Sequence, residues 1–171
     1  MDTTIRRCTA DDASALALVA QATMLETFAG VIDGADLVAN TLEARNAASF
    51  ARWLAEPEAR LWLAELKGAP IGYAGLATPD LPLPTTHNDI ELKRIYVLSR
   101  FQGGGPAGRL MDAAVDAAKA MGKARVLLGV KADNHRALAF YAKHGFAVIG
   151  TRRFLVGANY YDDAVLAKAL A

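Results

Sequence analysis

The sequence has a single cysteine, Cys8, among its 171 residues. One thiol excludes an intrachain disulfide and a structural zinc site built on cysteines, so we expect a reducing compartment, the cytoplasm. No uncharged stretch approaches the roughly 18 apolar residues that a membrane-spanning helix needs, and we expect no membrane partner. His87, His135 and His144 show no metal-ligand spacing, so we expect no metal site.

The sequence also lacks an excess of charge of either sign. Its 19 Lys and Arg residues nearly balance 18 Asp and Glu residues, which gives a net charge of +1. A charge this small argues against the large basic footprint of a nucleic-acid-binding protein. The length suits one buried core, so we expect a single domain over residues 1–171.

Hydrophobic periodicity predicts a mixed α/β fold. A Lys-Gly-Ala-Pro turn at 67–70 joins two strands into an antiparallel hairpin, and three prolines between 79 and 84 predict a loop. After this loop strands and helices alternate, which indicates a parallel crossover. The expected strands cover 5–9, 61–66, 71–76, 90–98, 125–130, a segment beginning at 146, and 160–166. The expected helices follow residue 9 and cover 36–56 with a break near Asn46, 105–121 and 134–145.

A glycine cluster follows the strand at 90–98 and opens the next helix. Glycines allow positive φ and close approach of the backbone, and a helix start presents unpaired N–H groups at the positive end of its dipole. Pro106 suits the first helical position. The segment predicts an anion site; an ordinary tight turn is the alternative, because a lone glycine motif is a weak signal.

Two phosphate-binding motifs can be compared with this cluster. A nucleoside-triphosphate loop is excluded, because Arg109 and Leu110 follow Gly108 where Lys and then Ser or Thr are needed. The dinucleotide pattern Gly103-x-Gly105-x-x-Gly108 matches literally. It lies beyond the midpoint of the chain, however, where too little sequence remains for a second mononucleotide half. A dinucleotide-binding oxidoreductase stays as an alternative.

The segment Gln102-Gly103-Gly104-Gly105-Pro106-Ala107 resembles the first signature of the GNAT superfamily of acetyltransferases. Residues 134–146 resemble its second signature, with an Asn, an aromatic pair and a closing Gly-Phe. The likeness is firm from residue 90 onward, and the 91–97 and 141 segments look most like bacterial PaiA-type polyamine acetyltransferases. The resemblance implies a twisted mixed sheet flanked by helices on both faces, and transfer from acetyl-CoA to a primary amine by direct attack in a ternary complex. It also implies a homodimer.

The resemblance further implies how acetyl-CoA binds. Main-chain groups of the strand end would pair with the pantetheine arm and supply oxyanion donors near Val97. Amides from 102 to 109 would surround the pyrophosphate, Asn134 would contact pantetheine, and two basic side chains would approach the phosphates. The expected cofactor-binding residues are Ile95, Tyr96, Val97, Gln102, Gly103, Gly104, Gly105, Ala107, Gly108, Arg109, Asn134, Arg136 and Lys143. Pro106 departs from the family's Ile, Leu or Val and removes one donor, and Gly104 replaces a frequent Lys or Arg.

Two residues are the catalytic candidates. Glu91 is the expected base, because an alkylamine with a pKa of about 10.4 is mostly protonated near neutrality. Strand alternation predicts Glu91, Lys93, Ile95 and Val97 on one face. Tyr141 is the expected acid for the leaving thiolate. For Glu91 the alternatives are a solvated strand-end carboxylate and a charge that only attracts a cationic substrate. For Tyr141 the alternative is an ordinary core aromatic.

The acceptor amine is open at this level. A polyamine would suit an acidic approach formed by five carboxylates, whereas amino-acid, antibiotic and protein amines are further candidates. The five are Asp33, Asp36, Asp80, Asp89 and Glu91. A non-catalytic sensor that binds acyl-CoA is a different class of function, with Pro106 as the sign of altered cofactor handling.

Overall fold

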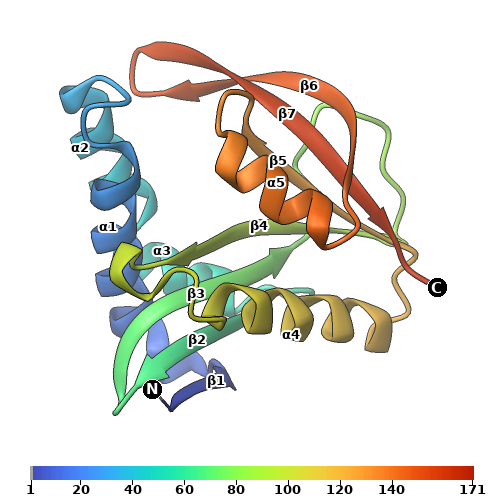
Figure 1. The fold of residues 1–171 in the computed structure, drawn as a ribbon, viewed down its shortest axis with the longest axis horizontal. Coiled ribbons are helices and arrows are strands. Elements are labelled where there is room, and N and C mark those ends of the chain that lie inside the picture. The colour runs from blue at the N-terminus through green and yellow to red at the C-terminus, as the bar shows by residue number, and fades with distance from the viewer. Residues whose placement is uncertain (1) are drawn as a thin grey trace.

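The computed structural model describes residues 2–171, apart from the side chain at position 154. One seven-stranded sheet runs through the molecule in the order β1-β2-β3-β4-β5-β7-β6 (Figure 1). The strands are β1 (Thr3–Arg7), β2 (Arg60–Leu66), β3 (Ala69–Ala77), β4 (Asp89–Val97), β5 (Arg125–Lys131), β6 (Ala147–Val156) and β7 (Asn159–Ala169). The helices are α1 (Ala13–Phe28), α2 (Gly34–Ala44), α3 (Ala47–Leu54), α4 (Pro106–Ala120) and α5 (His135–Lys143).

The predicted fold class is confirmed. Every strand pair is antiparallel except β4 with β5, which matches the expected antiparallel start and later parallel crossover. One apolar cluster packs α4 against the sheet, and a second packs α1 and α3 against it, so helices cover both faces. The break near Asn46 is confirmed as the start of α3, where the Asn46 side chain accepts from the Ser49 amide at 2.8 Å. The predicted strand at 5–9 was set two residues late.

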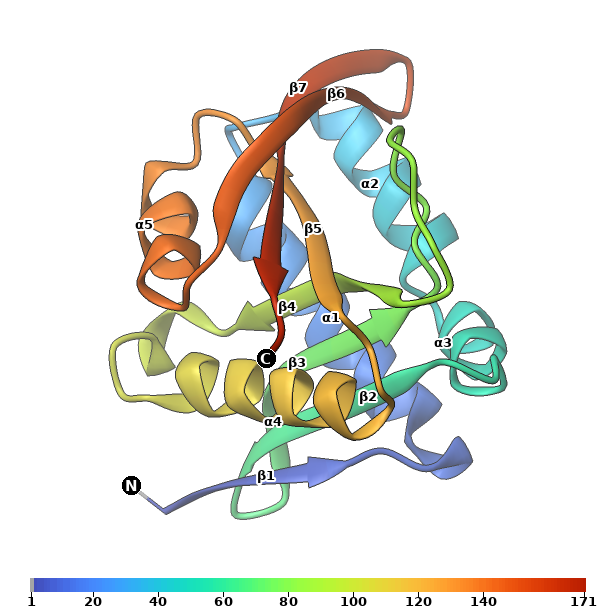
Figure 2. The ribbon, with the colours of Figure 1, turned by 90° about the vertical axis from the view of Figure 1, so that its right-hand side faces the viewer.

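The parallel pair β4–β5 is short, and this shapes the molecule. It holds for three residue pairs, from Asp89↔Arg125 to Glu91↔Leu127. Two hydrogen bonds of 2.9 and 3.0 Å from the Arg125 guanidinium to the Asp89 carboxylate fix its base. Beyond Glu91 the two strands diverge, as Figure 2 shows. The sheet therefore opens into a V beside the second half of β4.

A β-bulge in β4 lies next to this opening. Leu92 pairs with Leu76 and Arg94 pairs with Gly75, which leaves Lys93 as the extra residue. An extra residue reverses the alternation of side chains on either side of it. Leu92 before the bulge and Val97 after it both belong to the α4-side cluster.

The prediction that Glu91, Lys93, Ile95 and Val97 share a face was therefore wrong. Glu91 pairs with Ala77, which belongs to the cluster on the α1 and α3 side, whereas Ile95 packs on the α4 side. Glu91 shares its face with Arg94 and Tyr96 instead. Strict alternation could not show this, because the bulge adds one residue without a marker such as glycine.

Gly75 of β3 is where α3 packs closest to the sheet. A Cβ built there would lie 2.4 Å from the Trp53 ring, and the Trp53 indole donates to the Leu76 carbonyl at 3.1 Å. Only a glycine fits beneath an indole held at that height.

We predict that Gly75→Ala lowers the free energy of unfolding by about 1–3 kcal/mol, because the added methyl group must displace the Trp53 ring. Gly34→Ala is the matched control, since nothing lies within 4 Å of a Cβ at the start of α2. Thermal and urea unfolding of both variants measure the difference. Equal stability of the two variants would contradict the tight contact.

Candidate functional site

The V between β4 and β5 opens into a cleft of about 770 Å³. It is lined by residues of β4, β5, the glycine turn and α5, and by residues of α1, α2 and the β6–β7 hairpin. Both catalytic candidates, Glu91 and Tyr141, line this cleft. All the predicted cofactor-binding residues line it as well, except Gly104 and Arg109.

The glycine turn presents a row of unpaired amides. Gly103 and Gly105 adopt φ of +82° and +95°, conformations that L side chains rarely adopt. In the described chain no acceptor pairs with five amides at this helix start: those of Gly103, Gly104, Gly105, Ala107 and Gly108. Pro106 stands at the first helical position as predicted, and it adds no donor. The turn is consequently a concentrated anion site.

The row of free amides is shorter than the sequence indicated. The Gln102 amide donates to the Ser99 carbonyl at 3.2 Å, and the Arg109 amide donates to the Gly105 carbonyl at 3.1 Å. The Arg109 guanidinium is directed away from the cleft and bonds to the carbonyl of Thr3. The amides at both ends of the predicted 102–109 segment are therefore already hydrogen-bonded within the fold.

The second half of β4 has a free edge. Ile95, Tyr96 and Val97 pair with β3 on one side, and the parallel ladder to β5 has already ended at Glu91. The Gln102 side chain folds back and donates to the Val97 carbonyl at 2.9 Å, which ties the glycine turn to the strand end. Main-chain groups at this edge are available to an extended, amide-containing ligand, as in strand addition.

Tyr141 lies on α5, across the cleft from this edge. Its ring packs edge-on against Phe140 and Phe146, at centroid distances of 5.5 and 5.9 Å. Burial, and next the neighbouring Tyr96, raise the pKa of the Tyr141 phenol above its ordinary value of 10. The phenol therefore keeps its proton throughout the neutral range.

Glu91 is a buried carboxylate with only 4 % of its surface exposed. Burial raises its pKa above the ordinary 4.5, while the Asp80 amide, which donates to Glu91 Oε2 at 2.8 Å, acts in the opposite direction. A carboxylate whose pKa is raised binds a proton more readily, which suits a general base. The solvated strand-end carboxylate, the alternative from sequence, does not fit this burial.

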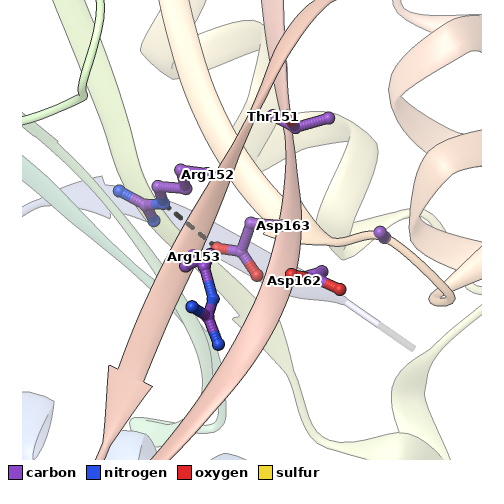
Figure 3. A pocket seen from close by; sticks show the side chains of 6 residues that line it. Thr151, Arg152, Arg153, Asp162 and Asp163 are labelled. Atoms are coloured by element: carbon purple, nitrogen blue, oxygen red, sulfur yellow. Dashed lines mark hydrogen bonds and ion pairs between the residues drawn. The ribbon is translucent and has the colours of Figure 1, made fainter.

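The β6–β7 hairpin contributes an ion pair that sequence reasoning missed. Arg152 and Asp163 are directly opposite each other in the hairpin, and Arg152 Nε lies 3.2 Å from Asp163 Oδ2 (Figure 3). Both residues line the cleft. The Arg152 guanidinium also covers Gly129, where a Cβ would lie 2.6 Å from Nη2. Its charge favours the ionised form of Glu91.

The second signature has a structural role as well as a position in the cleft. The Asn134 side chain accepts from the Ala137 amide at 3.1 Å and so caps α5. Arg136 and Lys143 are exposed at the rim of the cleft. His144 lines the cleft, and its ring is tilted by 51° to the Phe140 ring with centroids 4.6 Å apart. Cys8, directly after β1, is partly buried, and burial raises the pKa of its thiol to about 12.

The five carboxylates expected to form an acidic approach do not gather. Asp33 caps α2, Asp36 bonds to the Ala158 amide and the Asn159 side chain, and Asp89 is paired with Arg125. Asp80 and Glu91 line the cleft. The bonds of Asp36 and Asp89 join groups that are distant in sequence, so the pattern alone could not assign them, whereas Asp33 caps the amides of its own turn.

No helix within residues 2–171 is long and apolar enough to cross a bilayer. No group of three or more His, Cys, Asp or Glu side chains within the same range is arranged to hold a metal ion. The sheet contains one parallel pair, so the second parallel half that a dinucleotide fold requires is missing from the described strands.

Solved structures share this fold. The chain matches the PaiA N-acetyltransferase of Thermoplasma acidophilum in complex with coenzyme A with a TM-score of 0.82, 21% identity and coverage of 99% and 100% of the two chains. It matches the acetyltransferase yncA of Salmonella typhimurium, a structure with acetyl-CoA, with a TM-score of 0.73, 20% identity and coverage of 100% and 95%.

Comparisons of sequence identify the family of this chain as well as its fold. An uncharacterised N-acetyltransferase of Mycobacterium tuberculosis is 38% identical over 125 residues, which are 73% of this chain and 76% of the relative. The model of the Acetyltransferase (GNAT) family matches residues 32–146 and so includes the glycine turn, Glu91 and Tyr141. The chain therefore belongs to the acetyltransferase (GNAT) family of acyl-CoA-dependent N-acyltransferases.

Proposed function

We propose that this protein transfers the acetyl group of acetyl-CoA to a primary amine, by direct attack in a ternary complex. One observation carries the proposal: a single cleft joins the unpaired amides at 103–108, the free edge of β4 and the buried Tyr141 phenol. This order matches the parts of the coenzyme, which are a pyrophosphate, an extended arm with two amides and a reactive thioester.

The residues present fit the coenzyme chemically. The amides at the start of α4 suit a diphosphate, because they carry unpaired donors at the positive end of the helix dipole. The main chain of Ile95 to Val97 suits the amide-containing arm. Arg136 and Lys143 are free to approach the phosphates from the rim. Acetyl-CoA supplies the activated acetyl thioester when it is bound.

Two side chains of the protein would carry out the proton transfers of the reaction. Glu91, directly or through water, would take a proton from the incoming ammonium, and its raised pKa suits that task. Tyr141 would hold its proton until the sulfur leaves and then donate it there. The two side chains reach the cleft from β4 and α5, from opposite sides of the opening.

A polyamine is one candidate acceptor. It is supported by the structural likeness to the PaiA enzyme and by the two carboxylates, Asp80 and Glu91, that line the cleft. The other three carboxylates of the expected acidic approach are bonded within the fold. Cytoplasmic location and a homodimer are proposals too, from the single cysteine and the family resemblance; light scattering after size exclusion measures the second.

Titration with acetyl-CoA, followed by an amine panel with detection of the released thiol, tests the proposed function. Saturable acetyl-CoA binding together with amine-dependent thiol release is the expected result. Acetyl-CoA binding without thiol release for any amine would indicate the sensor function instead. NADH is the control ligand, and we expect no binding of it.

We predict that Tyr141→Phe lowers kcat by about 10²-fold or more, because the proton donor for the thiolate is removed. The Kd for acetyl-CoA should change little, since the ring and its packing against Phe140 and Phe146 are kept. Tyr160→Phe, at an exposed tyrosine of β7, is the matched control. Wild-type turnover in the Tyr141 variant would remove the acid role.

We predict that Glu91→Gln lowers kcat and changes its dependence on pH. In the wild type, kcat should rise as Glu91 loses its proton, at a pH above the ordinary carboxylate pKa of 4.5, and then level off. In the variant the rate should keep rising toward the amine pKa of about 10.4, because only the neutral amine reacts. Glu56→Gln, at an exposed residue, is the control. Superimposable profiles for Glu91→Gln and the wild type would leave Glu91 without a catalytic role.

A further inference from the structure

Two arginines line the acceptor end of the cleft without an acidic partner. Arg45 follows the last turn of α2, and Arg94 lies on β4 after the bulge. Neither guanidinium takes part in any ion pair found among residues 2–171. Two uncompensated positive charges in one partly buried cleft are unfavourable unless an anion binds there.

Arg45 is buried, with 7 % of its surface exposed. Its Nη1 donates to Asn40 Oδ1 at 2.6 Å, while its buried Nε has no hydrogen-bond partner. Buried polar groups are nearly always bonded, and an orphaned donor on a charged group is costly. The Nε atom itself is enclosed by protein, but the Arg45 residue lines the cleft, so its positive charge lies beside the space open to a ligand.

Arg94 is held rigidly beside Arg45. Its Nη1 and Nη2 donate to the Ala44 carbonyl at 3.3 and 3.4 Å, and its guanidinium lies 5.7 and 5.4 Å from the rings of Phe50 and Trp53. Burial, with a smaller contribution from the charge of Arg45, lowers the pKa of Arg94 below its usual value. The two guanidinium groups therefore repel each other in the absence of an anion.

The arginines lie near the proposed base. Because of the bulge, Arg94 and Glu91 share one face of β4, at most about 10 Å apart along a strand that rises about 3.3 Å per residue. The cleft is also lined by apolar side chains from α1, from residue 32 before α2, and from the β6–β7 hairpin. They are Met24, Phe28, Ile32, Val156 and Tyr161.

We propose that the acceptor is an amine that also carries a carboxylate, most simply an α-amino acid with an apolar side chain, whose carboxylate binds between Arg45 and Arg94. This inference rests on the proposed function and specifies its acceptor. The carboxylate compensates the two unpaired positive charges, and the arginine fork suits its two oxygens. The amine then faces Glu91, and the side chain meets the apolar wall.

With this acceptor, the bonds and protons exchanged in the acetyl transfer are the same as for any primary amine. The amine nitrogen forms a bond to the acetyl carbon as the carbon–sulfur bond breaks. The nitrogen gives up a proton to Glu91 or to water, and the sulfur receives one from Tyr141. A polyamine, by contrast, would bring further positive charge against two arginines, at an energetic cost that grows as the site excludes water.

A substrate panel tests the proposal on the wild-type protein. L-leucine, L-methionine and L-phenylalanine are each compared with their α-amides and with spermidine, as kcat/KM for thiol release. We expect at least one acid to exceed its own amide and spermidine by tenfold or more. Amides or spermidine used as well as every acid would overturn the proposal, while the proposed acetyltransferase function would stand.

Substitutions of the two arginines test whether the substrate carboxylate binds between them. Arg45→Met and Arg94→Lys should raise KM for the preferred acid by tenfold or more, with little change for its amide or in the Kd for acetyl-CoA. Arg52→Met, at an exposed arginine of α3 outside the cleft, is the control. Melting temperatures verify that each variant folds. The shift of melting temperature produced by the preferred acid should be lost in Arg45→Met; a retained shift would contradict the carboxylate site.

Discussion

The early end of the pairing between β4 and β5 is the constraint on which the site depends. Three parallel pairs, locked by the bidentate contact between Arg125 and Asp89, hold the strands together at one end. Past Glu91 the sheet has no continuous ladder, so the main chain of β4 faces an opening instead of a neighbour. Unpaired main-chain N–H and C=O groups are rare inside a sheet, because leaving them without a hydrogen bond costs free energy. Here they form the floor of the cleft.

The bulge at Lys93 determines which side chains lie on each face of β4 beside this opening. Side chains before and after it exchange faces, so Glu91 and Arg94 point to the same side of β4 while Ile95 packs on the other. One strand consequently supplies a carboxylate and a cation toward the face covered by α1 and α3, and a free edge toward the glycine turn. Without the extra residue, regular alternation would separate Glu91 from Arg94.

Charge in the cleft is distributed unevenly. Arg152 is paired with Asp163, and its charge acts on Glu91 from the hairpin. Arg45 and Arg94 have no such carboxylate in the described chain, even though helix and aromatic contacts hold them in place. A fold stabilised by about 5–15 kcal/mol in total tolerates few uncompensated buried charges. Their retention here is therefore consistent with a binding role.

Local pattern determined much of this protein. The elements, the mixed sheet, the glycine turn with Pro106 at the helix start, and the pairing of Glu91 with Tyr141 as candidates all follow from residues close together in sequence, read by periodicity and by resemblance to the family. Those features depend on φ preferences, helix and strand spacing and caps, which are local physical properties. Only the tertiary structure decided the bulge at Lys93, the long-range bonds of Asp36 and Asp89, and the meeting of Arg45 with Arg94. Each of these features depends on which distant segments pair and pack. The spacing of residues along the chain does not specify that pairing.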